Sequence, residues 1–155
     1  MEERIKQLKA IAKEYNIEAE FNVKDMDGRG RNAGSAGDKM VWFSPFDDKD
    51  NLTAAFFHEL GHCLFNNIFN KAGLSSTHYF CSLSGEATCW EIGFMLAEKH
   101  GFKWEYDHPV YKFAYASLFS YVFGEGDDYL RKDIFLNDIQ EDFDLYLDRL
   151  EEQNA

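Results

Sequence analysis

The spacing of apolar residues in the first half of the chain predicts a helix, two strands and a further helix. Apolar side chains recur at helical intervals over residues 2–15, as on a helix that lies on a core. They then alternate with polar ones over residues 17–24, which is typical of a half-buried strand. Residues 39–44 form an apolar run that indicates a second strand. The next helix is expected to begin near Asn51, and it is apolar on nearly every side through Phe65, which predicts a helix buried all round.

The second half of the chain is predicted to be mainly helical. Residues 85–100 fit a helix with Ser84 as its N-cap and Gly101 as its stop signal. Another helix is expected to begin at Pro109, and its apolar residues on two sides indicate that it is well buried. Residues 139–152 mark an amphipathic C-terminal helix whose acidic side faces water.

The segment between the two predicted strands, residues 27–38, is rich in glycine. Its spacing matches neither GxGxxG nor GxxxxGK[ST], so we expect a hairpin connection rather than a nucleotide-binding loop. Such a hairpin could offer the edge of strand 39–44 to an extended peptide through main-chain hydrogen bonds. The same strand could equally be covered, and the sequence leaves both alternatives open.

Length and composition indicate one globular domain over residues 1–155. The chain is long enough to bury a core without metal or disulfides, and 45% hydrophobic and 17% aromatic residues exclude a disordered chain. The formal charge of −12 argues against sequence-independent nucleic-acid binding, because a phosphate backbone would be repelled. A solvated acidic surface is favoured over a surface for cationic partners.

Localisation is predicted from the absence of export and membrane signals. The first residues carry no apolar signal core, and the longest apolar-rich run, residues 113–123, is too short to span a bilayer. Cys63, Cys81 and Cys89 are odd in number and form no CxxC pair, which suits a reducing compartment and packing as small hydrophobes. We therefore expect a soluble cytoplasmic protein with no membrane partner.

The clearest chemistry in the sequence is the run His58-Glu59-Leu60-Gly61-His62. Side chains four residues apart lie one above the other on a helix, so both imidazoles can reach one zinc ion at about 2.0–2.1 Å. Glu59 is rotated by about 100° from His58, where it can act as general base on a water at the metal. Gly61 predicts a close approach of another backbone, because an interior glycine otherwise weakens a helix.

Two histidines leave catalytic zinc one protein ligand short, so a third is expected downstream. The helix predicted for residues 85–100 offers Glu86 and Glu91. At 100° per residue Glu86 falls inside the apolar stripe of this helix, whereas Glu91 shares the outer face with Glu98. A carboxylate inside an apolar stripe requires a cation, so Glu86 is assigned as the ligand in preference to Glu91. The alternative role for Glu86 is a favourable interaction with the helix dipole.

Three other residues are weaker candidates for the site. His78 and Tyr79 fall in residues 67–84, which are predicted to form a loop over the metal, and either could donate to a developing oxyanion. His108 could be a distant contact to the metal or the transition state. An ordinary surface role is favoured for each of the three.

The spacing of these motifs resembles the gluzincin metallopeptidases, and more closely the ImmA/IrrE-type group found in bacteria and their phages. In that group HExxH on one helix is followed on the next by Glu-Ala-Asn-x-Phe-Ala. Here Glu86 and Ala87 match, while Thr88, Trp90 and Glu91 stand in place of the asparagine, the phenylalanine and the second alanine. The resemblance covers roughly residues 40–100.

The resemblance implies a single α+β domain of zincin-like fold, with a small N-terminal sheet, a zinc-binding helix pair and a helical C-terminal part. It also implies three zinc ligands and a catalytic base: His58, His62, Glu86 and Glu59. The expected activity is hydrolysis of a peptide bond in a narrow range of protein substrates. Two alternatives are a zinc-containing regulatory or inhibitory binding protein without turnover, and zinc-dependent hydrolysis of a non-peptide amide.

Overall fold

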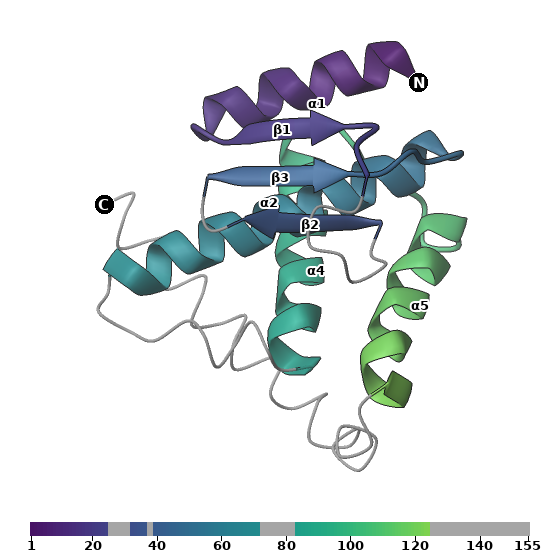
Figure 1. The fold of residues 1–155 in the computed structure, drawn as a ribbon. Coiled ribbons are helices and arrows are strands. Elements are labelled where there is room, and N and C mark those ends of the chain that lie inside the picture. Colours follow the sequence, from purple (N-terminus) through teal and green to yellow (C-terminus); the bar gives the residue numbers. More distant parts are fainter. Residues whose placement is uncertain (25–31, 37–38, 72–82, 125–155) are drawn as a thin grey trace.

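The computed structural model describes residues 1–24, 32–36, 39–71 and 83–124, and within them the chain is an α+β protein (Figure 1). Four helices and three strands are assigned to the described residues. In chain order they are α1 (Glu2–Glu14), β1 (Glu18–Phe21), β2 (Ala33–Ala36), β3 (Met40–Phe43), α2 (Lys49–Lys71), α4 (Leu83–Lys99) and α5 (Pro109–Gly124). The C-terminal helix predicted for residues 139–152 lies outside the described residues, as do His78, Tyr79 and Cys81.

Two of the helices end where a residue adopts a left-handed backbone conformation. After α1, Asn16 has φ 58°, and the N–H of Ile17 donates to the carbonyl of Ala12 over 3.0 Å. After α4, Gly101 has φ 88° and its N–H donates to a carbonyl in the last turn over 3.0 Å. These bonds satisfy carbonyls that a helix end leaves unpaired. The stop signal predicted at Gly101 is therefore confirmed.

The helix that carries the histidines is longer than predicted at both ends. The Asp48 side chain caps its N-terminus, because Oδ1 accepts from the backbone N–H groups of Asp50 at 2.8 Å and Asn51 at 2.9 Å. α2 therefore begins at Lys49, two residues earlier than expected. It also continues through residues 67–71, which had been assigned to a loop. Likewise α4 begins at Leu83, so Ser84 lies inside the helix and is not its N-cap.

The sheet differs from the hairpin that the sequence suggested. Its strand order is β1-β3-β2, with β1 parallel and β2 antiparallel to the central strand β3. The prediction of a simple hairpin between the first two strands was wrong, because the glycine-rich segment contains β2, and β2 forms the hairpin with β3. Gly34 makes this pairing possible, since a β-carbon there would lie 2.7 Å from Nε1 of Trp42. β3 is paired on both sides, so of the two alternatives left open for this strand the structure shows the covered one.

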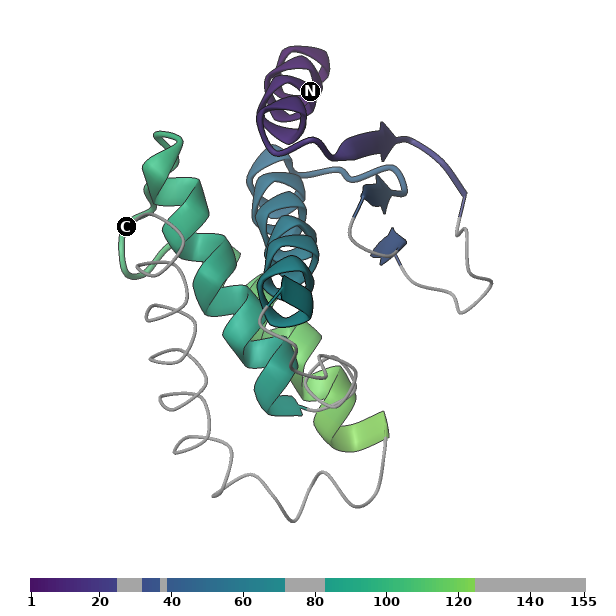
Figure 2. The ribbon, with the colours of Figure 1, turned by 90° about the vertical axis from the view of Figure 1, so that its left-hand side faces the viewer.

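The elements form layers with α2 in the middle. Figure 2 shows the sheet on one side of α2 and α4 on the other. This placement explains why the helix is apolar all round: every residue from 52 to 63 is buried. Its largest fully buried side chains include Phe56, Phe57 and Leu60, which join the main core between the sheet, α1 and α4. The prediction of a fully buried helix is confirmed.

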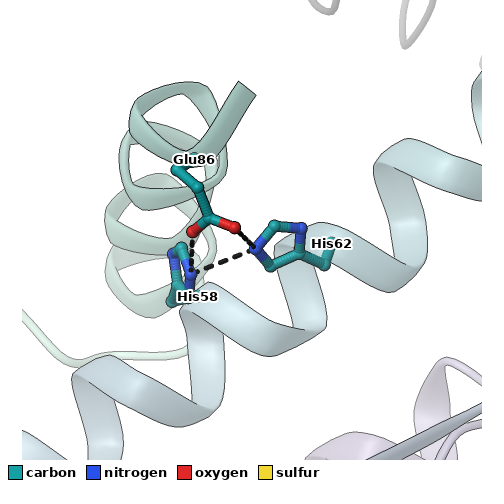
Figure 3. Close-up of side chains that lie close together, drawn as sticks. All are labelled: His58, His62 and Glu86. Atoms are coloured by element: carbon teal, nitrogen blue, oxygen red, sulfur yellow. Dashed lines mark hydrogen bonds and ion pairs between the residues drawn. The ribbon is translucent and has the colours of Figure 1, made fainter. Parts of the chain in front are cut away.

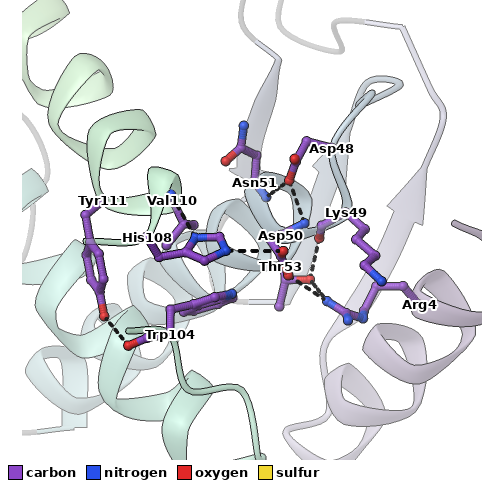
Figure 4. Close-up of polar contacts among 10 residues, drawn as sticks. All are labelled: Arg4, Asp48, Lys49, Asp50, Asn51, Thr53, Trp104, His108, Val110 and Tyr111. Carbon is purple, nitrogen blue, oxygen red and sulfur yellow. Dashed lines mark hydrogen bonds and ion pairs between the residues drawn. The ribbon is translucent and has the colours of Figure 1, made fainter. Parts of the chain in front are cut away.

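The N-terminus of α2 is tied to α1 and α5 by a polar cluster (Figure 4). Arg4 of α1 donates to Oγ1 of Thr53 over 2.6 Å and lies 3.6 Å from Oδ1 of Asp50. On the other side of Asp50, Oδ2 lies 3.6 Å from Nε2 of His108, and Nδ1 of His108 accepts from the N–H of Val110. His108 therefore caps α5 and braces α2, and it is not among the residues that gather around the metal-ligand candidates.

The helix α5 begins at Pro109 as predicted, but only one of its sides is well buried. Val110 and Ala114 join Trp90 in a second, smaller apolar cluster, whereas Tyr115 is 63% exposed. The expectation that both sides of this helix are buried was therefore wrong over its described side chains. No helix among the described residues has the length and apolarity needed to cross a membrane.

Candidate metal centre

Three potential metal ligands meet between α2 and α4 (Figure 3). His58 and His62 project from one face of α2, and Glu86 projects from the first turn of α4. Nε2 of His58 lies 3.1 Å from Nε2 of His62 and 3.1 Å from Oε2 of Glu86, while Nε2 of His62 lies 3.2 Å from Oε1. All three residues are buried, at 6%, 7% and 6% exposure. The structure thus brings together the three side chains that the sequence singled out.

The separations among these atoms fit a small tetrahedral cation. Ligands at about 2.0–2.1 Å from zinc in tetrahedral geometry stand about 3.3 Å apart. The measured separations of 3.1, 3.1 and 3.2 Å are close to this value. Two imidazole nitrogens and a carboxylate also form a donor set that zinc accepts, and three protein ligands leave one coordination position open. The residues present could therefore hold a small divalent cation such as zinc.

Close backbone contact between the helices allows Glu86 to reach the histidines. A β-carbon on Gly61 of α2 would lie 3.0 Å from the carbonyl oxygen of Cys89. A β-carbon on Gly93 of α4 would lie 2.9 Å from the backbone nitrogen of His58. Both glycines therefore stand where any side chain would force the helices apart. The close approach predicted at Gly61 is confirmed, and the matching role of Gly93 had not been predicted.

In the metal-free cluster, the electrostatic surroundings favour a negatively charged Glu86 and a positively charged His62. Burial alone would raise the pKa of Glu86, but the charge of His62 and hydrogen bonds from both histidines outweigh it and hold the pKa well below its usual value. Burial opposes the charged form of His62, yet the Cys89 sulfur and the Glu86 carboxylate together raise the pKa of His62 well above 6.5. A positive charge is thus accommodated where a cation would sit.

The two histidines are held by different neighbours on α4. Nδ1 of His62 lies 3.3 Å from Sγ of Cys89, and burial raises the pKa of this thiol, with His62 offsetting only part of the effect. The ring of His58 stacks on Trp90 with centroids 4.1 Å apart and planes 24° from parallel. Nδ1 of His58 is buried and has no hydrogen-bond partner in the part of the chain that the structure describes. Stacking therefore replaces the hydrogen bond that usually orients a ligand histidine.

The two other glutamates of the motifs differ in environment. Glu59 is 8% exposed and follows His58 directly on α2. Glu91 is exposed on the outer face of α4. The geometry therefore brings Glu86, and not Glu91, to the histidines.

Sequence reasoning missed the contacts of Cys89 and Trp90 with the histidines. Both residues stand on the same apolar stripe of α4 as Glu86, which was recognisable from the helical period. Which of the two residues contacts which histidine depends on how α2 and α4 cross. The helical period of the sequence gives no information on that crossing. Cys63 and Cys89 are both buried, and Cys63 belongs to the main apolar cluster, as expected of a cysteine that packs as a small hydrophobe.

Comparisons with known proteins add no relative to this description. No protein-family model, no curated protein and no solved structure matches the chain.

Proposed function

We propose that this chain is a zinc-dependent metallopeptidase with a zincin-like fold. The observation that carries the proposal is the buried convergence of two imidazole nitrogens and a carboxylate at 3.1–3.2 Å, with a second buried carboxylate, Glu59, next to the first histidine. A purely structural cluster would not require this second glutamate. Buried carboxylates are unfavourable unless they are paired or used.

In this proposal, His58, His62 and Glu86 would hold zinc, which would supply Lewis acidity to the reaction. Glu59 would accept a proton from the attacking water, whose oxygen forms a bond to the peptide carbonyl carbon. The same carboxyl group would give that proton to the nitrogen of the leaving amine as the C–N bond breaks. The buried surroundings of Glu59 strengthen its electrostatic interaction with the reacting atoms, because few waters screen it.

An extended peptide is the substrate conformation that this scaffold suits best. Among the described strands β2 pairs with β3 alone, so main-chain hydrogen bonds to an extended peptide would form at its other edge. β2 packs on α2, and Ala36 of β2 pairs with Met40 of β3. The carbonyl of Met40 lies 3.9 Å from Sγ of Cys63, the residue after His62. We therefore propose that the substrate adds to β2 and crosses the turn of α2 that carries His62.

Substitution of Glu59 by glutamine tests the proposal, with Glu91→Gln as the matched control on the exposed face of α4. Each purified protein is assayed for bound metal, and each is incubated with a library of proteome-derived peptides whose new termini are identified by mass spectrometry. We expect one zinc per chain in all three proteins. Cleavage by Glu59→Gln should be about 10²–10⁴-fold slower than by wild type and Glu91→Gln, because the general base is lost.

Two results would contradict the proposal in different ways. Equal cleavage by wild type and Glu59→Gln would exclude Glu59 as the base. Stoichiometric zinc without any cleavage by wild type would favour a zinc-containing binding protein, in which the metal stabilises the helix pair but turns nothing over.

A further inference from the structure

The two ring nitrogens of His62 face different neighbours. Nε2 points to the ligand cluster, 3.1 Å from Nε2 of His58 and 3.2 Å from Oε1 of Glu86. Nδ1 points away from the cluster, 3.3 Å from Sγ of Cys89. Both the ring and the sulfur are buried. The contact between Cys89 and His62 is thus separate from the three-atom cluster, although it shares a residue with it.

The position of the sulfur is fixed by the backbone. The carbonyl oxygen of Cys89 is the atom that a β-carbon on Gly61 would meet at 3.0 Å. Cys89 therefore abuts two consecutive residues of α2, Gly61 through its main chain and His62 through its side chain. Where two helix backbones come this close, only a short side chain fits between them, and sulfur is the acceptor that this residue provides.

From these contacts we infer that Cys89 is a positioning residue for the metal: its sulfur accepts the Nδ1–H of His62, which fixes the ring orientation and leaves the lone pair of Nε2 for the ion. The inference rests on the metal site proposed above. A histidine that binds a metal through one nitrogen must carry its proton on the other, and the partner of that proton sets the tautomer. Carboxylates and carbonyls usually fill this role, whereas here the partner is a thiol.

Packing alone is the competing explanation, and the chain offers a control for it. Cys63 on α2 is a second buried cysteine, and its Sγ lies 3.9 Å from the carbonyl of Met40. Cys63→Ala and Cys89→Ala remove the same atom from equally buried positions. Cys89→Ala removes the sulfur that lies 3.3 Å from Nδ1 of His62.

The experiment measures zinc affinity by competition with a chromophoric chelator, for wild type, Cys89→Ala, Cys89→Ser and Cys63→Ala. Circular dichroism checks that each variant is folded. Loss of an outer partner of a ligand typically weakens metal binding 10–100-fold, and we expect this loss for Cys89→Ala. Cys89→Ser should recover part of the affinity, because its hydroxyl can accept the same proton. Cys63→Ala should bind zinc as wild type does.

A second measurement needs no variant. In the zinc-loaded wild type, nitrogen-15 chemical shifts of the imidazoles should show His62 protonated at Nδ1, with a proton that exchanges slowly with water. The inference is overturned if His62 carries its proton at Nε2, if Cys89→Ala binds zinc as tightly as wild type, or if Cys89→Ser is as weak as Cys89→Ala. Absence of zinc binding by wild type would instead overturn the proposed function itself, so the two failures are distinguishable.

Discussion

Gly93 lies directly against His58: a β-carbon on Gly93 would come 2.9 Å from the backbone nitrogen of the histidine. Gly93 stands seven residues after Glu86 on α4 and four after Cys89, so all three share one face of that helix. The glycine therefore sets the distance between α2 and α4 at one end of this face, and Glu86 reaches the histidines at the other end. The geometry of the candidate metal site therefore depends on Gly93 having no side chain, two helical turns away from the Glu86 carboxylate.

Replacing Gly93 by alanine should weaken both the fold and the metal site. The new methyl group would meet main-chain atoms of α2, which can move only together with the rest of that helix. The two helices must therefore separate by some tenths of an ångström or more. Overpacking of this kind lowers the free energy of unfolding by about 1–3 kcal/mol, partly offset by the better helix propensity of alanine. We expect zinc affinity to fall at least about tenfold, because a ligand displaced by part of an ångström no longer completes the geometry.

A suitable control for Gly93→Ala is Gly101→Asn. A β-carbon on Gly101 would meet no atom within 4 Å, but φ 88° is a conformation that side-chain-bearing residues adopt only with strain, asparagine less than most. Gly101→Asn should therefore lower the urea midpoint, while chelator competition should show a zinc affinity close to wild type. Unchanged zinc affinity in Gly93→Ala would show that the backbone contact does not control the ligand geometry.

Alanine at Glu86 should remove stoichiometric zinc, and alanine at Glu91 should not. The two residues belong to one helix, yet Glu86 lies 3.1 and 3.2 Å from the histidine nitrogens while Glu91 is exposed. Metal analysis after gel filtration of both variants makes the comparison directly. If Glu91→Ala lost zinc and Glu86→Ala retained it, the third ligand would be Glu91, and the assignment of Glu86 would be wrong.

The stacked pair of His58 and Trp90 predicts that an aromatic ring is needed at position 90. Trp90→Phe keeps a flat surface against the imidazole, whereas Trp90→Leu removes it while leaving an apolar side chain in the same cluster. We expect zinc affinity to drop several-fold more in Trp90→Leu than in Trp90→Phe, since ring pairs contribute about 0.5–1.5 kcal/mol beyond burial. Equal affinities in the chelator assay would mean that Trp90 only fills space.

The parts of this structure that could be predicted from sequence are those set by local periodicity. The angle of 100° per residue was sufficient to place Glu86 on the inner face of α4 and Glu91 on the outer one. The apolar surroundings of His58 and His62 likewise indicated a helix buried all round. Both predictions concern a single helix and need no partner.

The parts that could not be predicted depend on contacts between distant segments. β2 consists of Ala-Gly-Ser-Ala, which has no alternation of apolar and polar residues, and it is a strand because β3 offers it an edge and Trp42 lies over Gly34. The contacts of Cys89 and Trp90 with the histidines follow from the helix crossing, which is set by glycines rather than by a ligand motif.

Stability of the metal-free protein should pass through a maximum between about pH 4.5 and pH 6.5. Glu86 has a lowered pKa when folded, so its contribution is present above the unfolded value of 4.5 and is lost as the pH falls. His62 has a raised pKa when folded, so its contribution is present below the unfolded value of 6.5 and is lost as the pH rises through the folded value. Urea midpoints measured with a chelator present should therefore be lower at pH 8.5 than at pH 6.

Zinc should reverse the alkaline part of this dependence, because the ion and the proton compete for Nε2 of His62. The stabilisation by a fixed excess of zinc should accordingly grow from pH 6 to pH 8.5, as the proton becomes easier to displace. Glu86→Gln offers the matched control, since it removes the charge that lies against both histidines and should flatten the profile of the metal-free protein. A wild-type profile already flat in the presence of chelator would mean that His62 is not charged in the metal-free cluster.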